Sequence, residues 1–296
     1  MKNYTYIYII TLLILATTAL TAQNSGYIFY NQHINIVNPA AVGMEHGHTV
    51  SVDIRNQWQG DRDAPQTQTL FTTHRINDRI ALGLSIVNDK VFIQKQAGIY
   101  ADFAYSLPID EHSDLLMGLK AGGDFFNLDG SRINTYNMVY DPYLQTISGK
   151  FQPNVGVGLF YDHNDFFVGV SVPNLLASDD AKLEDGVMTR VADRMHAYAN
   201  AGYYWRLSPD FTLKPMVQLQ FAKDIDASHH VTLAGEYLKI AELGITYRTD
   251  KAVSGYLLFQ IPKYYVAVGY GYESNLQSGL NMAARNSHEF LVQFKW

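Results

Sequence analysis

Side chains that could perform catalysis occur in two short runs of this 296-residue sequence. Ser228-His229-His230 and Ser287-His288 each place a hydroxyl beside an imidazole, the pair that a Ser–His–acid hydrolase uses. Both runs lie in stretches where apolar and polar residues alternate, so neighbouring side chains would point to opposite faces of a strand. No further motif accompanies them. We therefore predict that the chain is not an enzyme, has no catalytic residues and needs no cofactor.

Metal ligands are also sparse in the sequence. His46 and His48 would share one face of a strand, but two imidazoles without a third ligand make a weak zinc site. Asp61 and Asp63 could bind calcium in a loop, although Arg62 lies between them and further oxygen ligands are missing. The chain contains no cysteine, which excludes disulfides, thiolate metal sites and an acylated N-terminal Cys. We predict no metal site.

The last strand of the sequence shows which elements must position these side chains. Its alternating face consists of Phe290, Val292, Phe294 and Trp296, opposed by Glu289, Leu291, Gln293 and Lys295. The closing strand of an outer-membrane β-barrel needs one face in lipid, the other in the lumen, and an aromatic residue at the membrane boundary. These four residues are the barrel-closing signal.

The same period-two alternation recurs along nearly the whole chain and predicts an all-β protein, a transmembrane antiparallel β-barrel of about fourteen strands. Pro215 interrupts one strand, where its missing N–H would mark a bulge or an edge. A soluble β-sandwich or repeat protein is the rival architecture. The predicted strands cover residues 50–54, 66–75, 80–86, 99–107, 115–124, 154–161, 166–172, 203–207, 211–221, 231–237, 243–247, 257–261, 264–272 and 289–296.

Charged residues in the predicted strands fall on the face opposite the apolar one. That placement fits a barrel, because a charge facing lipid at mid-membrane costs about 2–4 kcal/mol. The balance of signs favours ion pairs inside the lumen over a single-sign selectivity filter. The residues are Asp53, Asp102, Asp124, Glu236, Glu242 and Glu289 against Arg55, Lys120, Arg206, Lys214, Arg248 and Lys295.

The N-terminus predicts export. Lys2 precedes an apolar run over residues 4–20, and Thr21-Ala22 offers small residues for cleavage, so residues 1–22 are interpreted as a signal peptide, with an uncleaved anchor as the alternative. Residues 23–46 would then be an N-terminal periplasmic or lumenal segment, and residues 47–296 the barrel. The 21 tyrosines suit a membrane boundary. The chain has no basic tail or patch that would predict nucleic-acid binding. We expect the bacterial outer membrane and its lipid as the surroundings.

Connection lengths predict an orientation, because these barrels have short periplasmic turns and longer external loops. Both chain ends would lie in the periplasm. The aromatic residues of the two longest loops, with Met188, suit protein contacts. Residues 59–65, 89–96, 127–152, 174–193, 223–229 and 274–286 are the longer connections.

Several blocks of the sequence stand out in order between about Gln23 and the C-terminus. They contain Asn38-Pro39-Ala40 and Gly43; Arg55-Asn56-Gln57-Trp58; Pro65; Asn88-Asp89-Lys90; and Pro173-Asn174. In this order the blocks resemble the PorP/SprF family of the type IX secretion system of Bacteroidetes. The resemblance implies an outer-membrane barrel that supports secretion: either surface attachment of a secreted adhesin-like protein, often one used in gliding motility, or docking of periplasmic secretion components. The implied partners are those components or the C-terminal domain of the secreted protein.

Each block also has a physical interpretation of its own. Asn38-Pro39 with Gly43 predicts a structural turn, Arg55 can pair inside the barrel, and Trp58 can anchor at the membrane boundary. The other blocks lie at strand ends, where side chains cap loop backbones or meet a surface partner. A general solute channel resembling a porin is the alternative function, and a plug formed by residues 23–46 is compatible with a barrel of this size.

Overall fold

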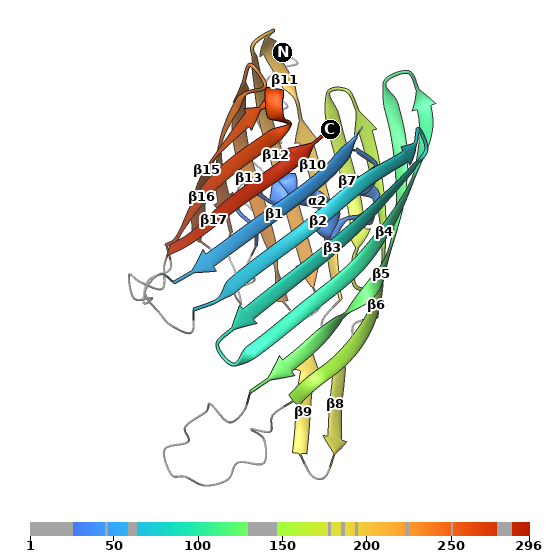
Figure 1. Cartoon of the computed structure of the whole chain (residues 1–296), viewed down its shortest axis with the longest axis vertical. Coiled ribbons are helices and arrows are strands. Elements are labelled where there is room, and N and C mark those ends of the chain that lie inside the picture. The colour runs from blue at the N-terminus through green and yellow to red at the C-terminus, as the bar shows by residue number, and fades with distance from the viewer. Residues whose placement is uncertain are drawn as a thin grey trace, which may run out of the picture.

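A single antiparallel sheet closes on itself to form a barrel (Figure 1). The computed structural model describes residues 26–44, 47–58, 64–129, 147–176, 179–184, 187–192, 195–222, 225–249, 251–276 and 286–296. Neighbouring strands follow chain order, and the first strand pairs with the last. The strands are β1 His48–Gln57, β2 Gln66–Asn77, β3 Ile80–Val91, β4 Gln94–Asp110, β5 Ser113–Leu128, β6 Ile147–His163, β7 Phe166–Val172, β10 His196–Tyr203, β11 Trp205–Ser208, β12 Phe211–Ala222, β13 Ile225–Tyr237, β14 Ala241–Arg248, β15 Ala252–Ile261, β16 Val266–Asn275 and β17 Asn286–Lys295.

The barrel has fourteen strands once β10 and β11 are counted as one. Only Tyr204 separates them, and both pair with β12 in a continuous register, with Gly202 opposite Met216 and Trp205 opposite Leu213. Pro215 lies in this gap and has no N–H to donate to the ladder, which explains the interruption. The predicted fold class and strand number are confirmed.

Alternate residues of each strand face the lumen and the membrane. In β14, for example, Leu243, Ile245 and Tyr247 are exposed on the outer face while Glu242 and Thr246 are buried inside. Outward-facing residues are mostly Val, Ile, Leu, Phe and Tyr around the described wall, as lipid contact requires.

The two ends of the barrel differ in their connections. One, the short-turn end, carries turns at residues 78–79, 111–112, 164–165, 209–210, 238–240 and 262–265 together with the C-terminal Trp296. The opposite long-loop end carries the other connections, including a separate hairpin of β8 (Asp179–Glu184) and β9 (Val187–Ala192) that the sequence pattern missed. In Figure 1 this hairpin projects at the bottom, opposite the C-terminus.

Strand ends were the least accurate part of the prediction. The connection expected over 89–96 is a tight turn at Phe92-Ile93, and β13 begins at Ile225, because several strands continue beyond the membrane as polar hairpins. β4 is 17 residues long, whereas about 9–11 tilted residues cross a bilayer. Tyr264, expected in a strand, belongs to the 3-10 helix η4 (Pro262–Tyr264), since Pro262 starts a turn that ends at Tyr265 with φ 57°.

Some predicted features lie outside the described residues. They include the signal peptide over residues 1–22, His46, and Asp61 with Asp63. The proposed domain boundaries therefore stay predictions. Three short helical segments, η1 (Tyr30–Gln32), α2 (Ile34–Val37) and η2 (Pro39–Met44), precede the first strand. None of the helices in the described ranges is long and apolar enough to cross a membrane.

Candidate functional site

Residues 26–44 form a plug inside the barrel, visible as the short blue helices behind β1 and β2 in Figure 1. Their apolar side chains pack with lumen-facing residues of the wall, for instance Ile28, Phe29 and Ala40 with Leu116 and Leu291. Leu291 faces inward among polar neighbours, and the plug covers this apolar side chain so that it is completely buried. The core of this protein is the contact between plug and wall.

Asn38 fixes the corner between α2 and η2. Its side-chain oxygen accepts a hydrogen bond from the backbone N–H of Ala40 at 3.0 Å, which closes an Asx turn ahead of the φ-restricted Pro39. Its amide nitrogen donates to the carbonyl oxygens of Leu159 at 3.2 Å and Val170 at 3.4 Å. One buried side chain therefore shapes the plug and attaches it to β6 and β7.

Glycines in the wall make room for this corner. A Cβ atom on Gly118 would lie 2.1 Å from the backbone nitrogen of Ala40, and one on Gly158 would lie 2.0 Å from the side-chain oxygen of Asn38. Contacts this close are sterically impossible, so β5 and β6 need glycine where the plug backbone approaches.

A buried ion-pair network holds the other side of the plug. Glu289 on β17 accepts hydrogen bonds from the backbone N–H groups of Ile28 at 2.8 Å and Phe29 at 3.0 Å. Arg55 on β1 bridges Glu289 at 3.1 Å and Glu273 at 2.7 Å. These charges lie out of solvent, where a pair is stable only when its remaining polar atoms are hydrogen-bonded.

A second polar cluster lies around Glu242. Its carboxylate pairs with Lys214 at 2.7 Å and accepts hydrogen bonds from the Tyr256 hydroxyl at 2.7 Å and the Asn31 amide at 3.2 Å. Lys214 also pairs with Glu236 at 2.7 Å. Elsewhere in the lumen Lys120 pairs with Asp102 at 2.8 Å. Most of the charges that the sequence places in the lumen thus belong to ion pairs, as the pattern favoured, whereas Arg206 and Lys295 are exposed at the short-turn end.

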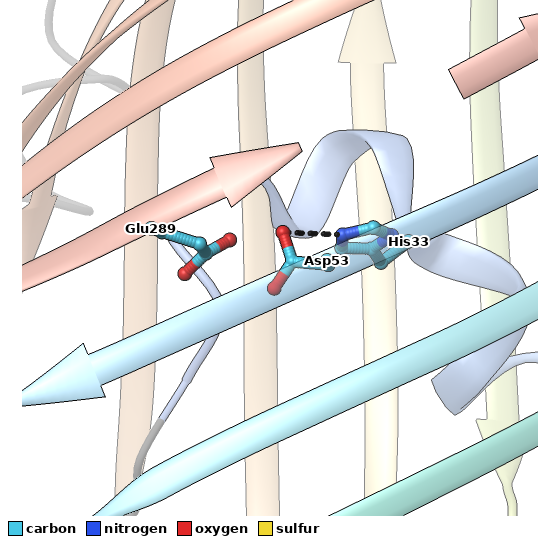
Figure 2. A group of neighbouring side chains, drawn as sticks. All are labelled: His33, Asp53 and Glu289. Carbon is cyan, nitrogen blue, oxygen red and sulfur yellow. Dashed lines mark ion pairs between the residues drawn. The ribbon is translucent and has the colours of Figure 1, made fainter. Parts of the chain in front are cut away.

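His33, Asp53 and Glu289 meet between the plug and the first and last strands (Figure 2). The three side chains are almost completely buried, and Nε2 of His33 lies 3.3 Å from an oxygen of Asp53. The rings of Tyr27 and Phe71 contact the imidazole edge-on, each with a centroid distance of 5.1 Å. Burial, partly opposed by the charge of Glu289, lowers the pKa of His33 to about 4 and keeps its ring neutral at pH 7.

The structure brings together sequence blocks that are far apart in the chain. Asn38-Pro39-Ala40 contacts the strand that contains Val170, and the carbonyl oxygen of Gly43 accepts a hydrogen bond from Arg75 at 3.0 Å. The family model described as type IX secretion system membrane protein PorP/SprF matches residues 19–294 of the chain. The chain belongs to the PorP/SprF family. As a family member with a closed β-barrel, it is an outer-membrane protein of the type IX secretion system.

Solved structures similar to this PorP/SprF chain support the barrel fold alone, because their sequence identities are low. The outer membrane protein Omp33 of Acinetobacter baumannii has a TM-score of 0.50 and 11% identity, covering 86% of this chain and all of that one. The toluene transporter TodX of Pseudomonas putida has a TM-score of 0.52 and 9% identity, covering 94% and 96% of the two chains. The toluene transporter TbuX of Ralstonia pickettii has a TM-score of 0.51 and 10% identity, covering 88% and 92%. No curated protein sequence matches this chain.

Two of the sequence blocks that resemble the PorP/SprF family lie at the long-loop end of β1 and β2. Asn56 is exposed on the outer face, and the backbone N–H of Gln57 donates to the carbonyl of Pro65 at 3.0 Å. Trp58 directly follows β1 with φ 51°, and its backbone N–H donates to the carbonyl oxygen of Asn286 at 2.9 Å. The backbone hydrogen bonds of Gln57 and Trp58 thus join the end of β1 to its neighbours on both sides at the long-loop rim.

The remaining PorP/SprF blocks also end strands at the long-loop end. Asn88 is exposed, Lys90 is half-buried, and Asp89 accepts a hydrogen bond from the Thr67 hydroxyl at 2.7 Å. Asn174, after the half-buried Pro173, accepts one from the backbone N–H of His196 at 3.0 Å. The side chains of Asp89 and Asn174 thus support rim structure, and contact with a partner stays a prediction.

The closing strand directs its four signal residues outward. Phe290, Val292 and Phe294 are exposed on the wall, and Trp296 is 58% exposed at the short-turn end. The backbone N–H of Trp296 donates to His48 at 3.1 Å and its carbonyl accepts from the N–H of His48 at 2.9 Å, so the last residue joins the first strand.

Sequence reasoning missed His33 and Glu273. Glu273 lies on the lumenal face of β16, and its alternation with the outward Tyr270 and Tyr272 could have identified it. His33 had no such signal, because it precedes the strands in a segment without periodicity. Neighbouring side chains of the Ser287-His288 run point to opposite faces, as expected for a strand. Ser287 is buried in the lumen, whereas His288 is half-buried and shares a hydrogen bond of 2.9 Å with the outward-facing Tyr270 hydroxyl.

Proposed function

We propose that this PorP/SprF protein is a non-enzymatic partner in type IX secretion that works through the ends of its barrel and not through its lumen. The observation that carries the proposal is the plug, which is held by the Asn38 corner on one side and by Arg55 and Glu289 on the other. A lumen occupied by a buried, hydrogen-bonded segment is poorly suited to passing a protein. Its two rims remain available for contacts with protein partners.

The positions of the internal cavities support this view. A cavity of about 300 Å³ is lined by Met44, Gln260 and Lys295 near the short-turn end. A second cavity of about 190 Å³ is lined by Thr67, Asp89 and Gln96 near the long-loop end. Plug residues line both cavities, Asn31 and Ala41 the first and Tyr27 the second. This arrangement favours a plugged lumen over an open pore.

We further propose that the long-loop end faces outward and holds a secreted adhesin-like protein at the cell surface by its C-terminal domain, as in gliding. Strands β4, β5 and β6 have 16 or 17 residues each and are longer than a strand needs to cross a bilayer. The β8–β9 hairpin adds a separate projection at the same end. Docking of periplasmic secretion components at the short-turn end is the other arrangement compatible with a plugged barrel.

Gene deletion in the source bacterium distinguishes these roles. A dedicated surface partner predicts that one large exported protein disappears from the cell surface while other type IX substrates are still secreted. A docking role predicts the loss of all such substrates together. Unchanged surface proteins would refute both. Replacing residues 177–194, which include the β8–β9 hairpin, with a short Gly/Ser linker should reproduce the first phenotype while the barrel still reaches the membrane.

A solute channel is the second candidate, because cavities inside the barrel contain charged residues such as Lys214, Glu236 and Glu242. The toluene transporters with a similar fold make transport of a small molecule worth testing. Steady conductance of the purified, intact protein in planar bilayers would favour the channel. We expect little conductance from the intact chain and an increase when residues 26–44 are deleted.

A further inference from the structure

We propose that His33, Asp53 and Glu289 bind a divalent metal ion, zinc by the chemistry of the ligands, which fastens the plug to the barrel where its first and last strands meet. Figure 2 shows Asp53 between the other two side chains. The three come from separate elements: His33 precedes α2 in the plug, Asp53 lies on β1 and Glu289 on β17. Within the described ranges they form the one group of three such residues with ligand atoms within 4.8 Å of one another.

Unsatisfied polar atoms point to a missing ligand. Neither ring nitrogen of His33 has a hydrogen-bond partner within the described residues, and no N–H or hydroxyl group there donates to the carboxylate oxygens of Asp53, although both side chains are buried. The carboxyl group of Glu289 is the hydrogen-bonding neighbour of Asp53, and a bond between the two needs a shared proton. A buried polar atom without a partner costs about 1–3 kcal/mol, and more when it is charged. Four such atoms in two adjacent side chains therefore need an explanation, and a bound cation would satisfy several of them at once.

The spacing fits zinc better than it fits a hydrogen bond. The 3.3 Å between Nε2 of His33 and the Asp53 oxygen is long for a charge-assisted bond, which is typically about 2.7–2.9 Å. Two ligand atoms bound tetrahedrally to zinc at about 2.0–2.1 Å are separated by about 3.3 Å. One carboxylate oxygen of Glu289 lies within 4.8 Å of both of these ligand atoms, and with three hydrogen bonds accepted the carboxylate keeps one of its roughly four lone-pair sites for an ion.

Charges around the group leave Asp53 in need of a cation. Arg55 pairs with Glu289 and Glu273, and Arg248 pairs with Glu273 at 3.2 Å. Among the described residues, His33 is the one basic side chain within ion-pair distance of Asp53. Glu289 is held by Arg55 and by the N–H groups of Ile28 and Phe29, the kind of outer-shell support that metal-binding carboxylates receive.

The donor types select zinc among common divalent ions. One imidazole nitrogen and two carboxylates suit Zn²⁺, whereas Ca²⁺ and Mg²⁺ prefer shells of oxygen ligands with six or more positions. The site is closed by the rings of Tyr27 and Phe71, so the ion would be structural. It would join the plug to β1 and β17, which pair with Arg55 opposite Glu289.

Metal content tests the proposal directly. The full-length mature protein is prepared without a polyhistidine tag, supplied with Zn²⁺ in detergent, and passed over a mild chelating resin before metal analysis. We expect one zinc ion per chain, and tetrahedral Co²⁺ absorption bands after Co²⁺ replaces it. His33→Gln and Asp53→Asn should lose both, and a strong chelator should lower the melting temperature of the wild-type protein only.

Two matched variants control for nonspecific effects. His230→Gln removes another buried imidazole that packs on the plug through Tyr30 at 5.3 Å. His74→Gln removes one ring of the pair stacked with His48 at 4.3 Å, which could bind zinc by itself. Both should retain the ion. A wild-type protein without bound zinc, retention by both His33→Gln and Asp53→Asn, or loss in His74→Gln would each overturn the proposal. The wild-type measurement decides the matter even where a variant fails to fold.

Discussion

At the scale of single residues, close packing and hydrogen bonds hold the plug against the barrel wall. Wall glycines allow the backbone at Ala40 to lie against β5, and Asn38 uses both ends of its side-chain amide, one toward the plug and one toward β6 and β7. Interiors packed this closely respond to the addition of one methyl group. The plug should therefore be sensitive to substitutions that leave the barrel itself unaffected.

Gly118→Ala should destabilise the packed state by about 1–3 kcal/mol, the usual cost of overpacking. Its Cβ would lie 2.1 Å from the backbone nitrogen of Ala40, which cannot rotate away as a side chain would. Gly255→Ala is the control, because the nearest atom to its Cβ is 3.8 Å away. Urea unfolding in detergent measures both, and equal stabilities would contradict the close approach.

Arg55→Met should cost about 3–5 kcal/mol of unfolding free energy, because it leaves Glu289 buried without its cation. The exposed pair of Arg206 with Asp165 provides the comparison, with side chains that are 57% and 45% exposed. Arg206→Ala should change stability by at most about 1 kcal/mol. Similar losses in the two variants would show that the Arg55 network is not buried. Adding Glu289→Gln to Arg55→Met should recover part of the loss.

Residues differ in how far the sequence could predict them. Arg55 and Glu289 were assigned to the lumen because strand alternation fixes the face of each residue. The partners of Asn38 could not be predicted, since they are backbone carbonyls on strands more than 100 positions away in the chain. His33 was missed for the same reason: a group that depends on three distant segments leaves no local pattern.

At the scale of elements, strand number and facing followed from the sequence, whereas strand ends did not. Lipid requires an apolar residue at every second position of the membrane-crossing part of a strand, so the facing of those residues can be predicted from the sequence. Beyond the membrane the requirement ends, and β3 and β4 continue to a turn at Phe92-Ile93 with polar residues that resemble a loop. The β8–β9 hairpin was missed on the same grounds.

A lysine scan along one strand tests the position of the membrane. Leu257→Lys places a charge on the outward face near the middle of β15 and should destabilise the folded protein by about 2–4 kcal/mol. Ile261→Lys is on the same face at the end of that strand, where the cost should fall to about 0–1 kcal/mol. Equilibrium unfolding in lipid bilayers gives the two values, and a larger loss at Ile261 would contradict the assigned membrane position.

At the scale of the whole molecule, the barrel has two unlike ends joined by a plugged interior. All described connections at the short-turn end are tight, and the long strands and the β8–β9 hairpin lie at the other end (Figure 1). If one rim of the barrel binds a secreted surface protein, the orientation of the barrel in the membrane decides which rim does so. Loop length predicts that the long-loop end is external.

Cysteine labelling in intact cells can test this orientation, because the natural chain has no cysteine. Lys251 and Lys239 form a matched pair: both are exposed turn residues with left-handed φ angles, 66° and 56°, at the long-loop and short-turn ends respectively. Lys251→Cys should react with a membrane-impermeant maleimide on whole cells, whereas Lys239→Cys should react only after the outer membrane is permeabilised. The shared backbone conformation makes the structural cost of the two substitutions similar, so a difference in labelling reports location. The reverse result would place the short turns outside and would transfer the proposed surface contact to the opposite rim.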